Sequence, residues 1–379
     1  MRKGRRSDKA VPEDMGRAIF VHGLDENNRP TINRNRGNPR PRLSYPVKHC
    51  TVSSRGADIT GPHRCRNLHP ESNVLHVTPE GPFHTPRLTK DYVVSKCRYV
   101  SGKMEPEKGD PTIRLDKEDI VRALRSVGVV LGDTVMFHSS LSSMGYVIGG
   151  ANTVIGAFLE AVGSGGTVAV PTLCQRDKEK RFEMWDILRS PSDVGVITEA
   201  FRLRPDAIRS DHPTHSVAAI GTLAEELTRD HKACRGRLSP WGDGAFAKYS
   251  PWDKLYQRNA SYVFIGVDFT VNTMQHFIQS LIVERALESC SAERRQPLAS
   301  EISGWLKDGV WPYYDDKRME ALHRTAGLMH YGKIGSATLR RIRARDMVDN
   351  ALQVLESHPR EWFDEKFLDW YGRACGSPM

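Results

Sequence analysis

The feature that most constrains the fold is an alternation of helix and strand patterns that begins at residue 115. The stretch LDKEDIVRALRSVGV has apolar residues at helical spacing, and Asp116 is placed to cap the helix. A β-branched strand within 132–145 comes next, followed by a helical pattern at 151–162 and a second strand at 166–172. Because this order is typical of a sheet covered by helices, we expect an α/β fold with a mainly parallel or mixed central sheet flanked by helices.

The same theme continues toward the C-terminus. The later expected elements are helices over 193–203 and 222–230, a strand at 262–267, a helix that opens near Asn272 and a charged helix that ends around 356. Ligands of such sheets gather at the carboxyl ends of the strands. The hydroxyl-rich HSSLSS loop, which begins at His138, follows the first of these strands. The sequence therefore predicts a polar ligand site at that edge of the sheet.

The positive charge of the chain is concentrated at its N-terminus. Residues 1–50 carry 12 Lys and Arg against 5 Asp and Glu, and so supply most of the net charge of +9. Residues 1–85 show no sustained helix or strand period, and they lack the aromatic interleaving typical of nucleic-acid binding. We therefore expect a low-order basic extension over 1–110, a single domain over 111–379, and no nucleic-acid partner.

Cysteine usage and hydropathy indicate where in the cell the protein is expected. The 7 cysteines include no C-x-x-C pair, which disfavours a disulfide framework and a cysteine-rich zinc site. Apolar runs such as YVFIGV at 262–267 are far shorter than the roughly 20 residues of a membrane helix. No apolar segment of a signal peptide follows the basic N-terminus. We therefore expect a cytoplasmic protein with no membrane partner.

Histidines are the main candidates for chemistry, because the sequence contains no common nucleotide, hydrolase or metalloprotease motif. His212 and His215 stand close together in SDHPTHS at 210–216. From the residues alone they have three interpretations: metal ligands, catalytic groups or ordinary loop residues. Pro213 disfavours a helix here and no further ligand has a suitable spacing, so we expect no bound metal.

Two other histidines stand where a strand gives way to the next segment. His276 falls one turn inside a helix that Asn272 or Thr273 would cap, and it is either a packed helix residue or a group at the mouth of the sheet. His138 opens the HSSLSS loop, whose donors suit either a polar ligand or a cap of the next helix. Neither segment decides between these alternatives alone.

The order of the segments is more specific than any one of them. Over about 112–350 the chain runs through FHSSLSSMGYVIGGANTVIGAFLEAVG, GTVAVPT, SDVGVITEAFR, IRSDHPTHSVAAIGTLAEELTRDH, YSPWDKL, FIGVDFTVNTMQH and HYGKIGSATLRRIRARDMVD. In this order it resembles the aminoglycoside 3-N-acetyltransferase family. The resemblance implies an enzyme that transfers an acetyl group from acetyl-coenzyme A (acetyl-CoA) to a primary amine of an aminoglycoside or related aminocyclitol, as in antibiotic resistance.

The resemblance also implies roles for individual residues. The coenzyme A contacts it implies come from the HSSLSS loop and from the serine of an H-P-x-x-S pattern: His138, Ser139, Ser140, Leu141, Ser142 and Ser216. His276 is the first choice for the general base and His212 the second. His276 matches the histidine of an N-T-x-x-H-x-x-E pattern, but Gln279 replaces the Glu, so it can orient the imidazole without supplying a charge.

Aminoglycosides are polycations, so the resemblance further implies an acidic acceptor pocket. The polar candidates in the matching segments are Glu183, Asp186, Asp211, Asp268 and Asn272. Acetyl-CoA and the small-molecule amine are then the expected partners, and a homodimer is left open. An alternative function also stays open: a non-catalytic or divergent coenzyme A-binding relative that acts on another amine and uses the basic arm for an anionic partner.

Overall fold

The computed structural model describes residues 106–174 and 184–376. Its strands are β1 Arg114–Leu115, β2 Thr134–Ser139, β3 Tyr146–Val147, β4 Thr167–Pro171, β5 Ile208–Arg209, β6 Val217–Gly221, β7 Ser261–Ile265, β8 His330–Ile334 and β9 Ala337–Arg343. Its helices are α1 Lys117–Ser126, α2 Gly150–Val162, α4 Val196–Arg202, α5 Ala224–Thr228, α6 Pro251–Gln257, α7 Met274–Ser289, α8 Ala292–Ser303, α9 Trp305–Asp308, α10 Asp316–Thr325, α11 Ala344–Ser357, α12 Pro359–Trp362 and α13 Glu365–Cys375, with 3-10 turns η1 Leu141–Ser143, η2 His231–Ala233 and η3 Phe269–Val271. Most of the extension predicted over 1–110 lies outside the described residues, so it stays a prediction.

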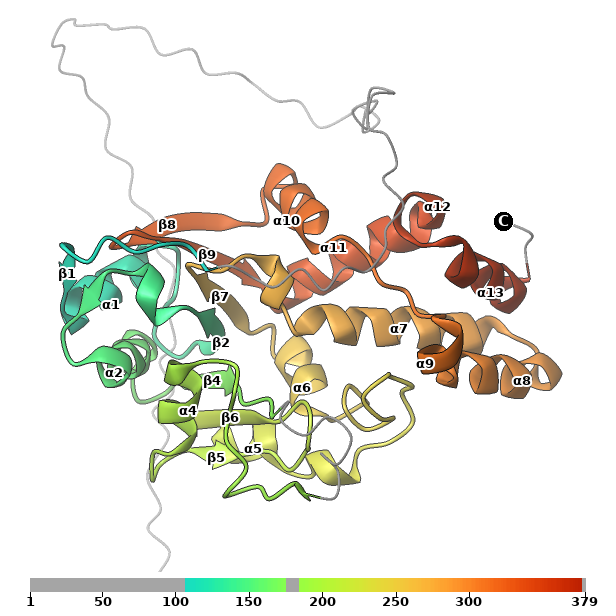
Figure 1. Ribbon diagram of the computed structural model, residues 1–379, viewed down its shortest axis with the longest axis horizontal. Coiled ribbons are helices and arrows are strands. Elements are labelled where there is room, and N and C mark those ends of the chain that lie inside the picture. The colour runs from blue at the N-terminus through green and yellow to red at the C-terminus, as the bar shows by residue number, and fades with distance from the viewer. Residues whose placement is uncertain (1–105, 175–183, 377–379) are drawn as a thin grey trace, which may run out of the picture. The chain divides into compact units, whose positions relative to one another are not determined.

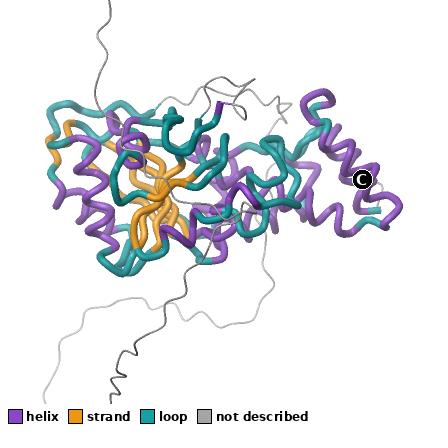
Figure 2. Tube along the Cα trace, turned by 90° about the horizontal axis from the view of Figure 1, so that it is seen from below, coloured by secondary structure: helices purple, strands orange, loops and turns teal. Residues whose placement is uncertain are grey.

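The central sheet is mixed and has seven strands in the order β5-β6-β4-β2-β7-β9-β8. β2 pairs in parallel with β4 on one side and with β7 on the other. The remaining neighbours in this sheet pair antiparallel. Helices lie on both sides of the strands (Figures 1 and 2). The predicted α/β fold with a mixed sheet flanked by helices is confirmed, and its parallel part is the centre of the sheet.

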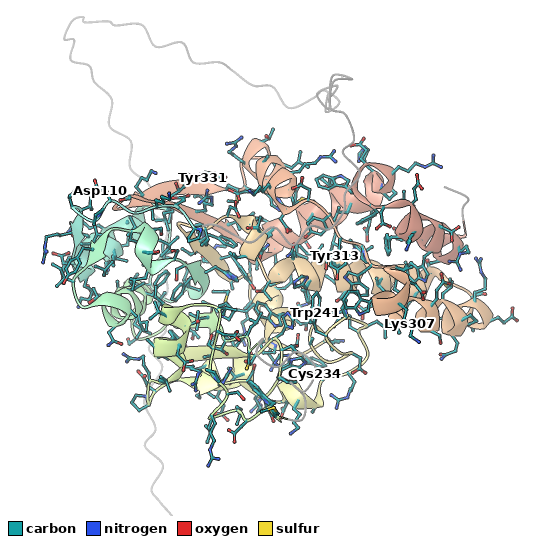
Figure 3. All side chains as sticks on the ribbon, viewed as in Figure 1. Asp110, Cys234, Trp241, Lys307, Tyr313 and Tyr331 are labelled. Atoms are coloured by element: carbon teal, nitrogen blue, oxygen red, sulfur yellow. The ribbon has the colours of Figure 1, made fainter. Side chains whose placement is uncertain are left out.

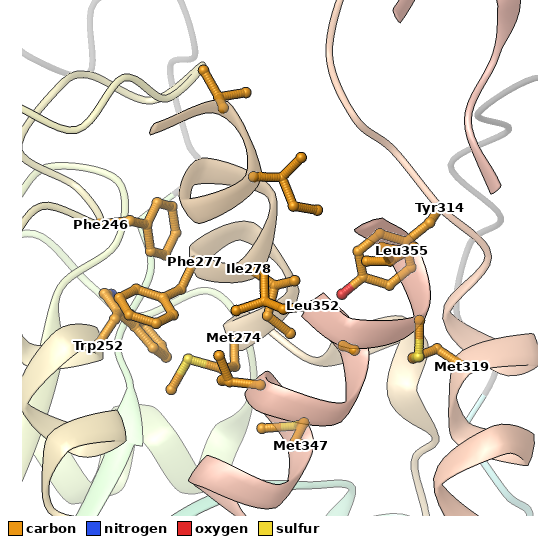
Figure 4. Packing of buried hydrophobic residues seen from close by; sticks show 14 of the residues in the cluster. Phe246, Trp252, Met274, Phe277, Ile278, Tyr314, Met319, Met347, Leu352 and Leu355 are labelled. Atoms are coloured by element: carbon orange, nitrogen blue, oxygen red, sulfur yellow. The ribbon is translucent and has the colours of Figure 1, made fainter. Parts of the chain in front are cut away.

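The two faces of the sheet pack into two hydrophobic cores. Side chains alternate along β2, so Phe137 faces α2, whereas Met136 belongs to the core around α7 and α11. Phe137 stacks on Phe158 of α2 with ring centroids 3.9 Å apart. Figure 4 shows the other core, where Phe277 of α7 and Leu352 of α11 are among the packed residues. By the same alternation, His138 points to the α7 side of the sheet.

Helix α1 begins as its sequence predicts. The Asp116 carboxylate accepts the N–H of Asp119 at 2.9 Å, and the Asp119 carboxylate accepts the N–H of Asp116 at 3.1 Å. This capping box satisfies two backbone donors at the start of the helix. The other predicted elements are present as α2, β4, α4, α5, β7, α7 and α11. The charged helix predicted to end around 356 is α11, which ends at Ser357 and directly follows strand β9.

The first described residues contact the sheet directly. The backbone N–H of Glu107 donates to the carbonyl of Gly266 at 3.1 Å. Its carboxylate pairs with Arg340 of β9 at 3.2 Å. The N–H of Asp110 donates to the Ser336 hydroxyl at 2.8 Å. Residues just before the predicted domain start at 111 therefore help to hold the β7–β9 side of the sheet.

Two further features concern membrane-spanning helices and the state of the cysteines. In the two described ranges, no helix combines the length and the apolar character that crossing a bilayer requires. Four cysteines in these ranges are free thiols: Cys174, Cys234, Cys290 and Cys375.

Candidate active site

The site lies at the edge of the sheet where β2, β4 and β7 end. Parallel strands bring their carboxyl ends to one edge, so Ser139 at the end of β2 and Val267 just after β7 line the same cavity, together with Pro171 at the end of β4. The first turn of α7 adds His276 to the lining. This cavity has a volume of about 420 Å³, and we call it the histidine cavity because His138 and His276 both line it.

A second cavity, of about 540 Å³, adjoins the first. Its lining includes four consecutive residues of the HSSLSS loop: Ser139, Ser140, Leu141 and Ser142. We call it the serine cavity. Ser139 and Val194 line both cavities. The two cavities therefore adjoin along these two residues.

The HSSLSS loop at 138–143, which we call the serine loop, is held in place by the end of β7. Gly266 has φ +63°, and a Cβ on it would lie 1.8 Å from the Ser143 hydroxyl, so only glycine fits this close approach. The Ser143 hydroxyl donates to the carbonyl of Ser140 at 2.7 Å. The backbone N–H of Ser140 donates to the carbonyl of Ile265 at 3.0 Å. Among the described residues, the hydroxyls of Ser140 and Ser142 pair only with each other, at 3.2 Å, which leaves them suited to bind a ligand.

His276 lies in the first turn of α7 among aromatic rings. Its ring centroid is 4.0 Å from that of Trp241, which comes from the loop between η2 and α6 (Figure 3), and 5.9 Å from that of Phe246. Its Nδ1 lies 3.1 Å from Oε1 of Gln279, one turn along the helix. Burial lowers the pKa of His276 to about 4, and the bond to Gln279 offsets only part of this shift. The imidazole is therefore neutral near pH 7.

The structure places His212 and His215 in the turn between β5 and β6, outside the linings of the two cavities. Nδ1 of His212 accepts the backbone N–H of His215 at 3.1 Å, and its ring stacks on that of His231 at 4.6 Å. Burial lowers the pKa of His212 to about 4. The ring of His215 meets that of His276 edge-on, with centroids 5.8 Å apart. The turn therefore supports the active-site histidine through His215.

His138 lies inside β2, because the strand continues to Ser139 and the loop begins only after it. Its ring stacks on Phe264 of β7 with centroids 5.2 Å apart. Burial lowers the pKa of His138 to about 3, so the imidazole is neutral, and its Nε2 has no hydrogen-bond partner among the described residues. His138 therefore faces the histidine cavity, while Ser140, Leu141 and Ser142 face the serine cavity.

Ser216 is not brought to either cavity. It is fully buried at the start of β6, and its hydroxyl donates to the carbonyl of Thr172 at 2.8 Å. Nε of Arg209 lies 3.2 Å from the same hydroxyl. These bonds join the segments that follow β4 and precede β6. The contacts of Ser216 are thus structural, whereas the resemblance implied a contact with coenzyme A.

Two of the predicted acidic residues stabilise local structure. Asp186 is exposed, and its carboxylate accepts two backbone N–H groups at 2.9 Å in its own turn. Asp211 accepts the indole N–H of Trp185 at 2.7 Å and lies 3.5 Å from Nζ of Lys232. Neither lines the two cavities. Glu183 lies outside the described residues.

Asp268 and Asn272 lie next to the histidine cavity. Asn272 lines it, and its Oδ1 accepts the N–H of Met274 at 3.1 Å at the start of α7. Asp268 accepts the N–H of Thr270 at 3.0 Å and lies 3.7 Å from Nζ of Lys317. These partners of Asp268 lie in η3 and at the start of α10, whereas the hydrogen-bond partner of Nδ1 of His276 is Gln279.

Sequence reasoning missed a carboxylate at this end of the cavity. Gln275 lines the histidine cavity. With its side-chain amide turned so that the NH₂ group faces Asp316, it donates to that carboxylate at the start of α10. Burial, together with the nearby charges of Asp315 and Asp268, raises the pKa of Asp316 well above its usual range. Asp316 lies about 40 residues beyond Gln275 in the sequence, and no motif links the two positions.

The groups at this sheet edge suit proton transfer beside a bound polar ligand. A neutral imidazole is able to accept a proton, and the serine hydroxyls and loop N–H groups are able to donate hydrogen bonds to the ligand. Within residues 106–174 and 184–376, no cluster of three or more His, Cys, Asp or Glu side chains is arranged to hold a metal ion. The neutral imidazole and the hydroxyl donors at this sheet edge favour acid–base chemistry.

Comparisons with known proteins agree with this geometry. The family model for aminoglycoside 3-N-acetyltransferases matches residues 136–356. The chain is 30% identical over 277 residues to aminoglycoside N(3)-acetyltransferase VII of Streptomyces paromomycinus, covering 62% of this chain and 90% of that protein. It is 29% identical over 263 residues to the aminoglycoside N(3')-acetyltransferase-like protein YokD of Bacillus subtilis, with the same shares covered. The crystal structure of aminoglycoside acetyltransferase AAC(3)-Xa is similar with a TM-score of 0.51 and 25% identity, over 65% of this chain and 94% of that one.

Proposed function

The chain belongs to the aminoglycoside 3-N-acetyltransferase family, and from this premise we propose that it transfers the acetyl group of acetyl-CoA to an amine of an aminoglycoside or related aminocyclitol. The observation that carries the proposal is the pair of adjoining cavities. A hydroxyl-rich loop lines one, and a neutral histidine lines the other. The reaction needs these two environments side by side.

The serine cavity is the proposed site of the coenzyme A arm. The hydroxyls of Ser140 and Ser142 face it with no backbone partner in the described part of the chain, so they are able to bind the amide and phosphate groups of the cofactor. The acetyl thioester at the end of the arm would then lie near Ser139, which lines both cavities. This position brings the reacting carbonyl carbon to the histidine cavity.

His276 is the proposed general base. The amine nitrogen attacks the thioester carbonyl carbon, the new C–N bond forms, the C–S bond breaks, and the coenzyme A thiolate leaves. His276 takes the proton that the amine nitrogen loses, on Nε2, because Nδ1 is occupied by Gln279. A base with a pKa of about 4 is adequate, since the amine nitrogen becomes far more acidic as the C–N bond forms. The proton then passes to the thiolate or to solvent.

The other ammonium groups of the acceptor are proposed to lie toward Gln275. Asp268 lies close enough for its charge to raise the pKa of the buried Asp316 carboxyl. A cationic group bound there would relieve this repulsion and favour the charged form of Asp316. This end of the cavity thus suits a polycation better than a neutral amine.

Family membership favours this activity over a non-catalytic coenzyme A-binding role. The deciding experiment incubates the full-length protein with acetyl-CoA and a panel of aminoglycosides, and follows free thiol and the mass of the antibiotic. We expect thiol release that requires the antibiotic, together with one added acetyl group on the product. Coenzyme A binding without release of thiol in the presence of any amine would contradict the proposal.

A further inference from the structure

Gln279 joins His276 to a tryptophan that lies far away in the sequence. Its Oε1 lies 3.1 Å from Nδ1 of His276 and 3.0 Å from Nε1 of Trp311. Trp311 is 1% exposed and stands in the loop between α9 and α10. The same oxygen is therefore within hydrogen-bonding distance of two nitrogen atoms, one from its own helix and one from the loop before α10.

The chemistry of the indole fixes the orientation of this amide. An indole Nε1 donates and never accepts a hydrogen bond, so the Gln279 atom that faces Trp311 must be the oxygen. That oxygen also faces Nδ1 of His276, and an amide oxygen only accepts. Nδ1 of the neutral imidazole must then carry the hydrogen. The lone pair of His276 is consequently on Nε2, the nitrogen left for the substrate.

We propose that Trp311 is a positioning residue, which acts through the Gln279 amide to hold His276 in the tautomer with hydrogen on Nδ1. Without the indole N–H, the amide is free to turn over and present its NH₂ group to His276. Nδ1 would then have to accept, and the hydrogen would move to Nε2. In that tautomer Nε2 has no lone pair with which to take a proton from the amine.

The neutral side chain at position 279 makes this contact necessary. A glutamate has two accepting oxygens, so it would orient the imidazole correctly in either rotamer. A glutamine has one correct and one incorrect orientation. Trp311 thus keeps an accepting oxygen toward Nδ1 of His276, which a carboxylate would do by itself. Its role therefore depends on the presence of Gln279. This dependence separates the proposal from a simple packing role for a buried tryptophan.

The test reads the tautomer directly, by NMR of the full-length protein labelled with ¹⁵N-histidine. The chain has 14 histidines, so the signals of His276 are identified by their loss in His276→Gln. We expect hydrogen on Nδ1 in the wild type and a substantial share on Nε2 in Trp311→Phe. Gln279→Glu combined with Trp311→Phe should return the hydrogen to Nδ1.

Trp370→Phe is the matched control. Trp370 is also fully buried, in the same core as Trp311, and its indole N–H donates to the carbonyl of Leu298 at 3.0 Å. It should lose a comparable amount of packing and leave the tautomer of His276 unchanged. A wild type with hydrogen on Nε2, or a folded Trp311→Phe with unchanged hydrogen on Nδ1, would overturn the proposal. If Trp311→Phe does not fold, hydrogen on Nε2 in the wild type would still overturn the proposal.

The kinetic consequence rests on the proposed function. Loss of the indole bond leaves the two orientations of the amide close in energy, so about half of the molecules would hold the unproductive tautomer and kcat of Trp311→Phe should fall by about twofold. The KM for acetyl-CoA should not change, and the added Gln279→Glu should restore kcat. If no amine is acetylated by the wild type, the proposed function fails, while the NMR result still decides the role of Trp311.

Discussion

His212 and His276 are two histidines with similar electrostatics and opposite hydrogen bonding. Burial lowers the pKa of both to about 4, so both are neutral near pH 7. Nδ1 of His212 accepts a backbone N–H, which puts its hydrogen on Nε2. Nδ1 of His276 faces an amide oxygen, which puts its hydrogen on Nδ1. A lowered pKa therefore does not identify a base, whereas the partner of the second nitrogen does.

The two histidines also differ in what surrounds them. The turn that carries His212 uses the imidazole as an acceptor for its own backbone, and the ring stacks on His231. His276 uses a side chain of its own helix as the partner and lines the histidine cavity. The first arrangement stabilises the turn, and the second leaves a nitrogen for substrate. Variants of the two histidines and of Gln279 test this difference directly.

The largest effect is expected from His276→Ala. Removal of the general base should lower kcat by about 100-fold or more. The dissociation constant of acetyl-CoA should remain close to that of the wild type, because His276 does not line the serine cavity. Steady-state kinetics and calorimetric titration with acetyl-CoA provide the two measurements. A variant with full turnover would remove His276 from the mechanism.

A smaller effect, on binding instead of turnover, is expected from Ser140→Leu. The larger apolar side chain would fill part of the serine cavity and remove a hydroxyl that pairs with Ser142. The dissociation constant of acetyl-CoA should rise by about tenfold, the size of effect expected when a bound polar group loses its partner. Val196→Ala serves as a control, because it also lines this cavity and opens space instead. Unchanged affinity in Ser140→Leu would place the cofactor elsewhere.

The sequence was informative where local rules decide the structure. The cap at Asp116, the central strands and the serine loop all follow from short-range patterns, and the structure contains them. The sequence did not predict the contacts between segments that lie far apart along the chain. Nothing in the local pattern around Trp311 or Asp316 indicates that these residues contact Gln279 and Gln275. Such contacts depend on the packing of α7 against the segment that follows α9.

The same distinction explains which site residues could be predicted. His276 and the serine loop were found through the order of their segments, and both line cavities. Ser216 directly follows the turn that carries His212 and His215, yet its hydroxyl donates to the carbonyl of Thr172 in the interior. Alternation along a strand decides which face a side chain takes, and the exact end of the strand fixes this alternation. A motif match does not supply that end point.

Gln279→Glu should change turnover by a few-fold and in a pH-dependent way. A carboxylate beside His276 favours the imidazolium and raises its pKa above the value of about 4 in the wild type. As the pH falls, the variant therefore loses its basic form before the wild type does. The ratio of kcat/KM of the variant to that of the wild type should fall with decreasing pH. Titration of the amine itself cancels in this ratio, and a ratio independent of pH would mean that residue 279 does not influence the base.

The smallest effect on catalysis is expected from His212→Ala, although its effect on stability should be clear. The alanine would leave the backbone N–H of His215 without its acceptor in a buried turn, and the stacking on His231 would be lost. An unsatisfied buried donor costs about 1 to 3 kcal/mol, so the free energy of unfolding in urea should fall by about 2 kcal/mol. Turnover of the folded fraction should stay within about threefold of the wild type, since Nε2 of His212 carries a hydrogen and has no lone pair for the amine proton.

His212→Asn is the informative partner of that variant. An Asn side-chain oxygen is able to accept a backbone N–H as the imidazole Nδ1 does, so it should recover part of the lost stability. It has no basic nitrogen, and therefore it could not recover activity that depended on a base at this position. If both variants remain folded and both lose turnover by about 100-fold, the size expected for a general base, the base lies in the turn that carries His212. In that event the tautomer of His276 would have no bearing on the acetyl transfer step.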